Sequence, residues 1–141
     1  MQNEAGKSPD HEMAYLATEG DVDELGHVSN VAYVRLVQEV AKAHSSAVGW
    51  DFEAYVRAGV VFVVRRHEID YLAPAYLGDS LRVITWIETW RGAVSERRTR
   101  IVRANDDREL VRSTTTWALV STTSTRPRRI PQEIVAAFMN G

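Results

Sequence analysis

The spacing of the hydrophobic residues changes at Gly59 from a helical period to a period of two, and that change constrains the fold more than any other feature. In residues 30–48, apolar side chains recur every three or four positions, which predicts one long amphipathic helix. A short second helix is expected over residues 51–58. From residue 60 the period is two, and turn residues separate the apolar runs. These runs predict strands over residues 60–71, 80–90, 94–103 and 109–121.

A first strand over residues 11–19 and a terminal helix over residues 131–140 complete the expected order. A long amphipathic helix has one apolar stripe to bury, and a curved antiparallel sheet can wrap around it. The sequence therefore predicts an α+β fold with one long central helix and a curved antiparallel sheet of about five strands. Because such a sheet leaves open edges, a homodimer or a larger assembly is expected.

Length and composition favour a single domain. The chain has 141 residues, enough for one hydrophobic core. Residues 1–10 are polar and predict a flexible segment rather than a secretory signal, so the domain is expected over residues 11–141. No run approaches the ~18 apolar residues of a membrane span, so no membrane contact and a cytoplasmic location are expected. The absence of cysteine excludes a disulfide framework, a thiolate zinc site and a cysteine nucleophile.

The charges argue against nucleic acid as a partner. The formal net charge is −2, whereas nucleic-acid-binding domains are normally basic. Almost all cations are arginines, which can grip phosphate groups with a bidentate fork. For any single arginine, a place on a solvated strand face is the more ordinary role. The arginines crowd the second half of the chain at Arg91, Arg97, Arg98, Arg100, Arg103, Arg126, Arg128 and Arg129.

Candidate chemistry concentrates in the segment Asp21-Val-Asp-Glu-Leu-Gly-His-Val-Ser-Asn-Val-Ala-Tyr33. Asp23 lies seven positions ahead of Asn30, where the helical pattern begins. The first N–H groups of a helix are unpaired and carry partial positive charge, so they suit a developing oxyanion. A base or nucleophile beside such an anion hole is the minimum equipment for acyl transfer.

Ordinary turn chemistry is the alternative for the same segment. Asp21 or Asp23 can accept backbone N–H bonds, and Gly26 can supply a positive φ. An EF-hand is excluded, because Leu25 and Ala32 occupy positions where a calcium loop needs an oxygen ligand. No metal site and no cofactor are expected.

Three segments carry a resemblance to a known family. They are the segment from Asp21 to Tyr33, the run Asp70-Tyr-Leu-Ala-Pro-Ala-Tyr-Leu-Gly-Asp79, and the tail Thr125-Arg-Pro-Arg-Arg-Ile-Pro131. Over about residues 13–134 the chain resembles the hotdog-fold acyl-CoA thioesterases of the 4-hydroxybenzoyl-CoA thioesterase type.

The resemblance implies hydrolysis of an acyl-CoA substrate with Asp23 as nucleophile or general base. It places the carbonyl oxygen on backbone N–H groups of Asn30 and Val31, with His27 and Tyr33 lining the pocket. His27 is also a candidate catalytic residue, through a supporting hydrogen bond more than through proton transfer. It also implies homodimers or homotetramers whose active sites are shared across subunits.

The nucleotide end of coenzyme A is expected on basic residues. The matching positions are Arg91, Arg126 and Arg128. Gly92 and Ala93 stand where the prototype enzyme carries further cations, and Ser29 stands where many relatives carry a second asparagine.

Several alternatives stay open. A sister group uses a glutamate within the helix, for which Glu39 is the candidate. The chain can also be a non-catalytic acyl-ligand binding protein on the same fold, or an acyl-carrier-protein thioesterase. Among the aromatic residues, Trp50 is a candidate pocket lid. The strand tryptophans Trp86, Trp90 and Trp117 are expected in core or dimer packing, with one of them open as a residue that shapes the acyl pocket. His67 is expected to be structural, and His44 shows no signal.

Overall fold

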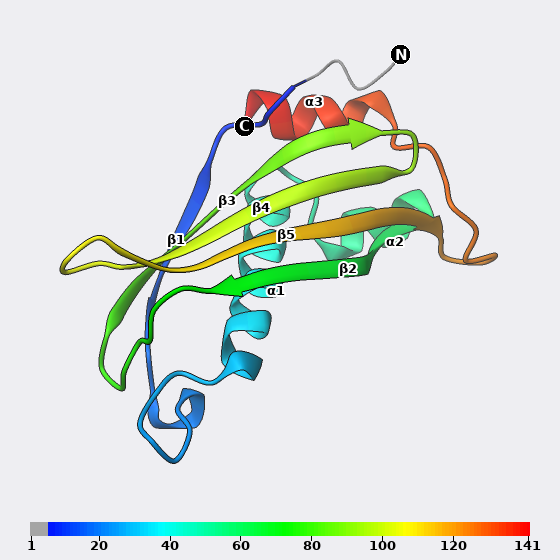
Figure 1. Ribbon diagram of the computed structural model, residues 1–141. Coiled ribbons are helices and arrows are strands. Elements are labelled where there is room, and N and C mark those ends of the chain that lie inside the picture. The colour runs from blue at the N-terminus through cyan, green and yellow to red at the C-terminus, as the bar shows by residue number, and fades with distance from the viewer. Residues whose placement is uncertain (1–5) are drawn as a thin grey trace.

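The computed structural model describes residues 6–141, and it contains one five-stranded sheet with three helices (Figure 1). The sheet has the order β1-β3-β4-β5-β2, and every neighbouring pair is antiparallel. The expected α+β architecture is confirmed. The strands are β1 His11–Leu16, β2 Val60–Tyr71, β3 Ser80–Arg91, β4 Val94–Arg103 and β5 Arg108–Ser121. The helices are α1 Asn30–Ala47, α2 Phe52–Ala58 and α3 Gln132–Asn140.

Helix α1 begins and ends where the sequence indicates. The Ser29 side chain accepts the backbone N–H of Ala32 at 3.2 Å, which caps the first turn. The chain leaves the helix at Gly49, whose φ of 95° is readily adopted by glycine. Between these ends the apolar stripe faces the sheet, and its buried members are Ala32, Tyr33, Leu36, Val37, Val40 and Ala41.

The sheet is a meander flanked by two edge strands. Strands β3, β4 and β5 follow one another through short turns, and Gly92 adopts a positive φ of 60° in the first of these turns. Strand β2 pairs with β5 from Val60 opposite Ser121 to Tyr71 opposite Val111. A bulge between Val64 and Arg66 interrupts that ladder. Consequently β1 and the long strand β2 are the two edges.

Strand β1 is shorter than the expected strand over residues 11–19. It ends at Leu16, and a 3₁₀ turn over Glu19–Asp21 follows. The physical reason is local: Thr18 donates its N–H and its hydroxyl to the Asp21 carboxylate at 2.8 and 2.9 Å. These bonds bend the chain away from the sheet and toward the start of α1.

The expected flexible segment over residues 1–10 falls partly outside the described residues, because the structure describes none of residues 1–5. Of the remainder, Ser8 is buried, and its N–H donates to the carbonyl of Ile87 at 2.9 Å. The Ser8 hydroxyl accepts the N–H of Ile87 at 2.8 Å. Packing against the sheet therefore begins at Ser8.

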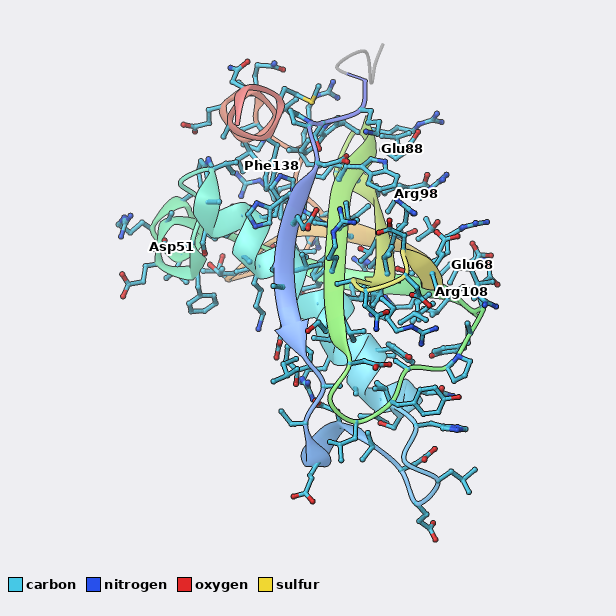
Figure 2. All side chains as sticks on the ribbon, turned by 90° about the vertical axis from the view of Figure 1, so that its left-hand side faces the viewer. Asp51, Glu68, Glu88, Arg98, Arg108 and Phe138 are labelled. Atoms are coloured by element: carbon cyan, nitrogen blue, oxygen red, sulfur yellow. The ribbon has the colours of Figure 1, made fainter. Side chains whose placement is uncertain are left out.

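The helices and the sheet enclose two apolar clusters. One lies between α1 and the strands β3, β4 and β5, with β1 packed against it, and the other lies under α3 and beside α2. Figure 2 shows Phe138 of α3 turned toward the interior, whereas Glu68, Glu88, Arg98 and Arg108 lie on the outer side of the sheet. Within residues 6–141, no helix is both long and apolar enough to cross a membrane.

Candidate active site

The loop of residues 22–29, called here the Asp23 loop, is a narrow hairpin beyond the N-terminal end of α1 (Figure 1). Val22 pairs with Val28, and Asp23 N–H donates to the His27 carbonyl at 2.8 Å. Gly26 adopts a φ of 79°, which closes the turn. The Asp23 loop therefore has a defined backbone, and Asp23 begins its turn, since the Gly26 N–H donates to the Asp23 carbonyl at 3.0 Å.

The Asp23 carboxylate is oriented by the backbone of its own turn. Its Oδ1 accepts the N–H groups of Leu25 at 2.9 Å and His27 at 3.1 Å. Its Oδ2 has no hydrogen-bond partner among the described residues, and the residue is exposed. The turn-capping role and a chemical role are thus compatible, since one oxygen holds the turn while the other is open to a water or a substrate.

Asp21 lies in a different environment from Asp23. It is buried, and its carboxylate accepts from the Tyr15 hydroxyl at 2.6 Å and from Arg35 Nη2 at 2.8 Å, in addition to both Thr18 donors. Burial alone would raise the pKa of Asp21, but the hydrogen bonds from Tyr15, Thr18 and Arg35 hold that pKa well below its usual range. Asp21 therefore fastens β1, the Asp23 loop and α1 together.

We expect Asp21→Asn to lower the free energy of unfolding at pH 7 by about 2 kcal/mol, because buried donors lose a charged acceptor. The pKa of Asp21 is lower in the folded state than in the unfolded state. The stability that the ionised carboxylate contributes is therefore fully present when the pH is above the unfolded-state pKa, and it is lost as the pH falls toward the folded-state pKa. Urea unfolding should show that the free energies of unfolding of wild type and variant differ less at pH 3 than at pH 7. The exposed Asp70→Asn is the control and should change stability by less than ~0.5 kcal/mol. A difference that does not depend on pH would contradict this account.

The N-terminus of α1 offers two backbone donors. The N–H of Ala32 is capped by Ser29, and the N–H of Tyr33 bonds the Ser29 carbonyl at 3.2 Å. Within the described chain, the N–H groups of Asn30 and Val31 have no acceptor, and Val31 is 78% exposed. These donors and the helix dipole can stabilise an oxyanion.

His27 and Tyr33, which were expected to line a pocket, lie in different places. The half-buried ring of His27 meets Tyr76 edge-on, with centroids 5.1 Å apart. Tyr33 is buried in the apolar cluster next to Tyr71, with ring centroids 5.9 Å apart. Burial raises the pKa of Tyr33, so its phenol stays neutral at physiological pH.

The three arginines expected to hold phosphates gather at one end of the sheet. The tail runs beside the first hairpin turn, because Ile130 N–H donates to the Gly92 carbonyl at 2.9 Å. Arg91, Arg126 and Arg128 are exposed, and none of them forms an ion pair with a described residue. They are therefore free to meet an anionic ligand.

A cavity of about 420 Å³ lies at the other end of α1 from the Asp23 loop, between α1, α2, α3 and the inner face of the sheet. Trp50 and Trp117 are among its lining residues, as the sequence allowed. The other lining residues include Ala41, Lys42, Ser45, Ser46, Phe52, Tyr55, Val61, Phe62, Ile87, Ser95, Arg97 and Phe138. No group of three His, Asp or Glu side chains within residues 6–141 could hold a metal.

Asp23 and the cavity are separated within one copy of the chain. Helix α1 has 18 residues. It is therefore about 27 Å long at 1.5 Å per residue. Asp23 precedes its first turn, whereas the cavity is lined by its last turns, including Ser45 and Ser46. The candidate carboxylate and the candidate acyl cavity therefore do not meet in a single copy.

Comparisons with known proteins agree on one family. The model of the acyl-ACP thioesterase N-terminal domain matches residues 9–138. The acyl-CoA thioester hydrolase YbgC of Escherichia coli is 30% identical over 118 residues, which cover 84% of this chain and 87% of YbgC. A 1,4-dihydroxy-2-naphthoyl-CoA thioesterase from Synechocystis superposes with a TM-score of 0.85 at 19% identity, covering 92% of this chain and 96% of its own. A Staphylococcus aureus protein in complex with CoA superposes with a TM-score of 0.86 at 12% identity, covering 92% and 82%.

Proposed function

The chain belongs to the acyl-ACP thioesterase family of hotdog-fold thioester hydrolases, and from that premise we propose that it cleaves acyl-CoA with Asp23 as its base or nucleophile. The protein is a thioester hydrolase. The observation that supports the finer assignment is the Asp23 carboxylate, which is fixed through Oδ1 by two N–H bonds while Oδ2 has no partner among the described residues. The open N–H groups of Asn30 and Val31 supply the complementary oxyanion donors.

The chemistry follows from these groups. With Asp23 as general base, Oδ2 takes a proton from a water whose oxygen attacks the thioester carbonyl carbon. Negative charge develops on the carbonyl oxygen, where the N–H groups of Asn30 and Val31 stabilise it. The carbon–sulfur bond then breaks, and the coenzyme A thiolate leaves and is protonated. With Asp23 as nucleophile, Oδ2 attacks the same carbon and the carbon–sulfur bond breaks, so that coenzyme A leaves as the thiolate and takes up a proton. Water then hydrolyses the resulting anhydride to the free acid and restores the Asp23 carboxylate.

We propose that a complete site needs two copies of the chain. The start of β2 contributes Val61 and Phe62 to the cavity. The end of β2 leads into the turn whose Ala75 carbonyl accepts the N–H of Val28 in the Asp23 loop at 2.9 Å. Because β2 is an edge strand, two copies can pair through it in antiparallel fashion, and the start of one β2 then lies beside the end of the other. Such a dimer brings the Asp23 loop of one copy to the cavity of its partner.

A panel of aromatic, short-chain and long-chain acyl-CoAs tests the function. Thiol release on at least one member, with kcat/KM above ~10⁴ M⁻¹s⁻¹, is expected of an enzyme on a good substrate. Acyl-CoA binding without thiol release would support the alternative of a non-catalytic acyl-ligand protein. Parallel assays on acyl groups carried by acyl carrier protein test the third alternative. An acyl-carrier-protein thioesterase would strongly prefer the protein-bound thioester to the acyl-CoA.

Arg126→Ala should raise KM for acyl-CoA by about threefold to fivefold and change kcat little, as expected for an exposed ion pair worth ~1 kcal/mol. The reason is that a phosphate contact acts on ground and transition states alike. Steady-state kinetics on acyl-CoA and on a truncated thioester lacking the nucleotide provide the measurement, and the truncated substrate should be unaffected. Arg108→Ala, at the opposite end of β5, is the matched control. Equal losses on both substrates would identify Arg126 as a structural residue of the tail.

A further inference from the structure

The cavity contains a buried cation beside several aromatic side chains. Arg97 lies on β4 with its side chain on the inner face of the sheet and is 5% exposed. Trp50, Phe62, Trp117 and Phe138 line the same cavity, together with polar residues that include Lys42 and Asp51. The guanidinium carbon of Arg97 lies 5.8 Å from the Phe138 ring centroid. This position was not predictable from the sequence, because Arg97 resembles the exposed arginines around it.

The hydrogen bonds of Arg97 leave part of the guanidinium unused. Nη1 contacts His44 Nδ1 at 2.9 Å and donates to Thr85 Oγ1 at 3.1 Å. Nε and Nη2 have no hydrogen-bond partner among the described residues. No carboxylate in residues 6–141 forms an ion pair with Arg97.

The charge on Arg97 is not neutralised by its neighbours. Burial lowers the pKa of Arg97 to about 10, so the guanidinium is still protonated at neutral pH. Burial, and then the charge of Arg97, lowers the pKa of His44 to about 3, so the imidazole is neutral and serves as an acceptor. Asp51 also lines the cavity, but it is exposed and caps α2 through the N–H of Ala54 at 2.9 Å. A buried charge without a counter-ion is expensive for a folded protein.

We propose that the cavity takes an acyl group whose far end carries a carboxylate, which pairs with the free face of the Arg97 guanidinium. This inference rests on the proposed thioester hydrolysis and specifies its substrate class: an ω-carboxyacyl thioester rather than a simple alkanoyl one. The volume of about 420 Å³ lies in the range of small-molecule sites. Aromatic walls suit the methylene chain, and a guanidinium fork suits a carboxylate bound through two parallel hydrogen bonds.

Kinetics on matched thioesters test the proposal. Wild type should hydrolyse glutaryl-CoA or adipyl-CoA with a kcat/KM at least ~10-fold above that of pentanoyl-CoA or hexanoyl-CoA, as expected of charge-assisted hydrogen bonds. Arg97→Gln should abolish this preference by losing activity on the carboxylated thioesters alone. Arg98→Gln, the adjacent arginine on the outer face, should keep it (Figure 2). A wild-type preference for the alkanoyl thioesters, or equal losses on both classes in Arg97→Gln, would overturn the proposal.

A binding measurement separates this proposal from the hydrolysis on which it rests. Millimolar adipate should raise the Tm of wild type and of Arg98→Gln but not of Arg97→Gln, whereas 1-hexanol, which has the same chain length but no carboxylate, should raise none of them comparably. If no thioester is hydrolysed but this adipate response is found, the hydrolytic function fails while the anion site stands. If Arg97→Gln does not fold, the wild-type preference between the two thioester classes and the wild-type response to adipate still decide the matter.

Discussion

Replacing Asp23 with asparagine should lower kcat by at least ~100-fold, because it keeps the size of the side chain but removes the carboxylate that acts on the thioester. The amide oxygen of asparagine can still accept the N–H groups of Leu25 and His27, which Oδ1 accepts in the wild type. The fold of the turn is therefore retained, and KM should change much less than kcat. Thiol release under saturating acyl-CoA provides the measurement, and circular dichroism verifies the fold.

Two controls sharpen this result. Glu24→Gln removes a neighbouring exposed carboxylate from the same turn and should leave kcat within about twofold, as is usual for surface substitutions. Glu39→Gln tests the sister arrangement. Glu39 lies within α1, exposed and paired with Arg35 Nε at 3.3 Å. If Asp23→Asn keeps most of its activity while Glu39→Gln loses it, the catalytic carboxylate is Glu39.

If each active site is built from two copies of the chain (a composite site), a mixed dimer of two inactive variants should regain activity. Asp23→Asn removes the carboxylate, and Ser46→Trp fills the mouth of the cavity from an exposed position on α1. A dimer with one copy of each variant has one site with both halves intact, so it should recover about half the wild-type activity per dimer. Co-expression with two different affinity tags and sequential purification would isolate this mixed dimer.

Each variant purified alone should remain below ~5% of wild-type kcat/KM, which makes the expected recovery at least tenfold. Light scattering at the assay concentration should give the mass of a dimer or a larger even-numbered assembly. A fully active monomer would refute the composite site. So would a mixed dimer that is correctly folded but as inactive as its parents.

The strands were predictable because local chemistry and tertiary packing agree. Residues 60–71 and 94–103 were expected as strands and are β2 and β4, since their period of two matches a sheet with one face on a helix. The expected end of β1 at residue 19 was wrong, because the strand ends at Leu16 and a side-chain-stabilised turn follows it. The bonds from Thr18 to Asp21 stop it, and such a turn competes with strand pairing in a way that hydrophobic periodicity does not register.

The candidate site was predictable only in part. The Asp23 loop and the start of α1 are neighbours in the sequence, so they could be recognised as one candidate site without the structure. The environment of Arg97 depends on which face of β4 each residue occupies. Ser95, Arg97 and Thr99 alternate along the strand and are buried on its inner face, whereas Glu96 and Arg98 face outward. Because the inner-face positions here hold a charged residue and small polar residues instead of apolar ones, the sequence pattern does not indicate which face is buried. His44, which showed no signal, is buried against Arg97 because it lies on the sheet-facing side of α1, one turn after Val40 and Ala41.

The pairing of β2 with β5 also affects how the chain reaches its folded state. Val60 faces Ser121 across the ladder, so closing this pair requires ordering the whole meander between them. The two hairpins of β3, β4 and β5 need only short loops and can form early, whereas β1 and β2 add at the edges later. Until β2 arrives, β5 presents an open edge whose final stretch, Trp117 to Val120, is apolar. Aggregation during refolding should therefore begin from this intermediate, and dilution should suppress it more effectively than added salt.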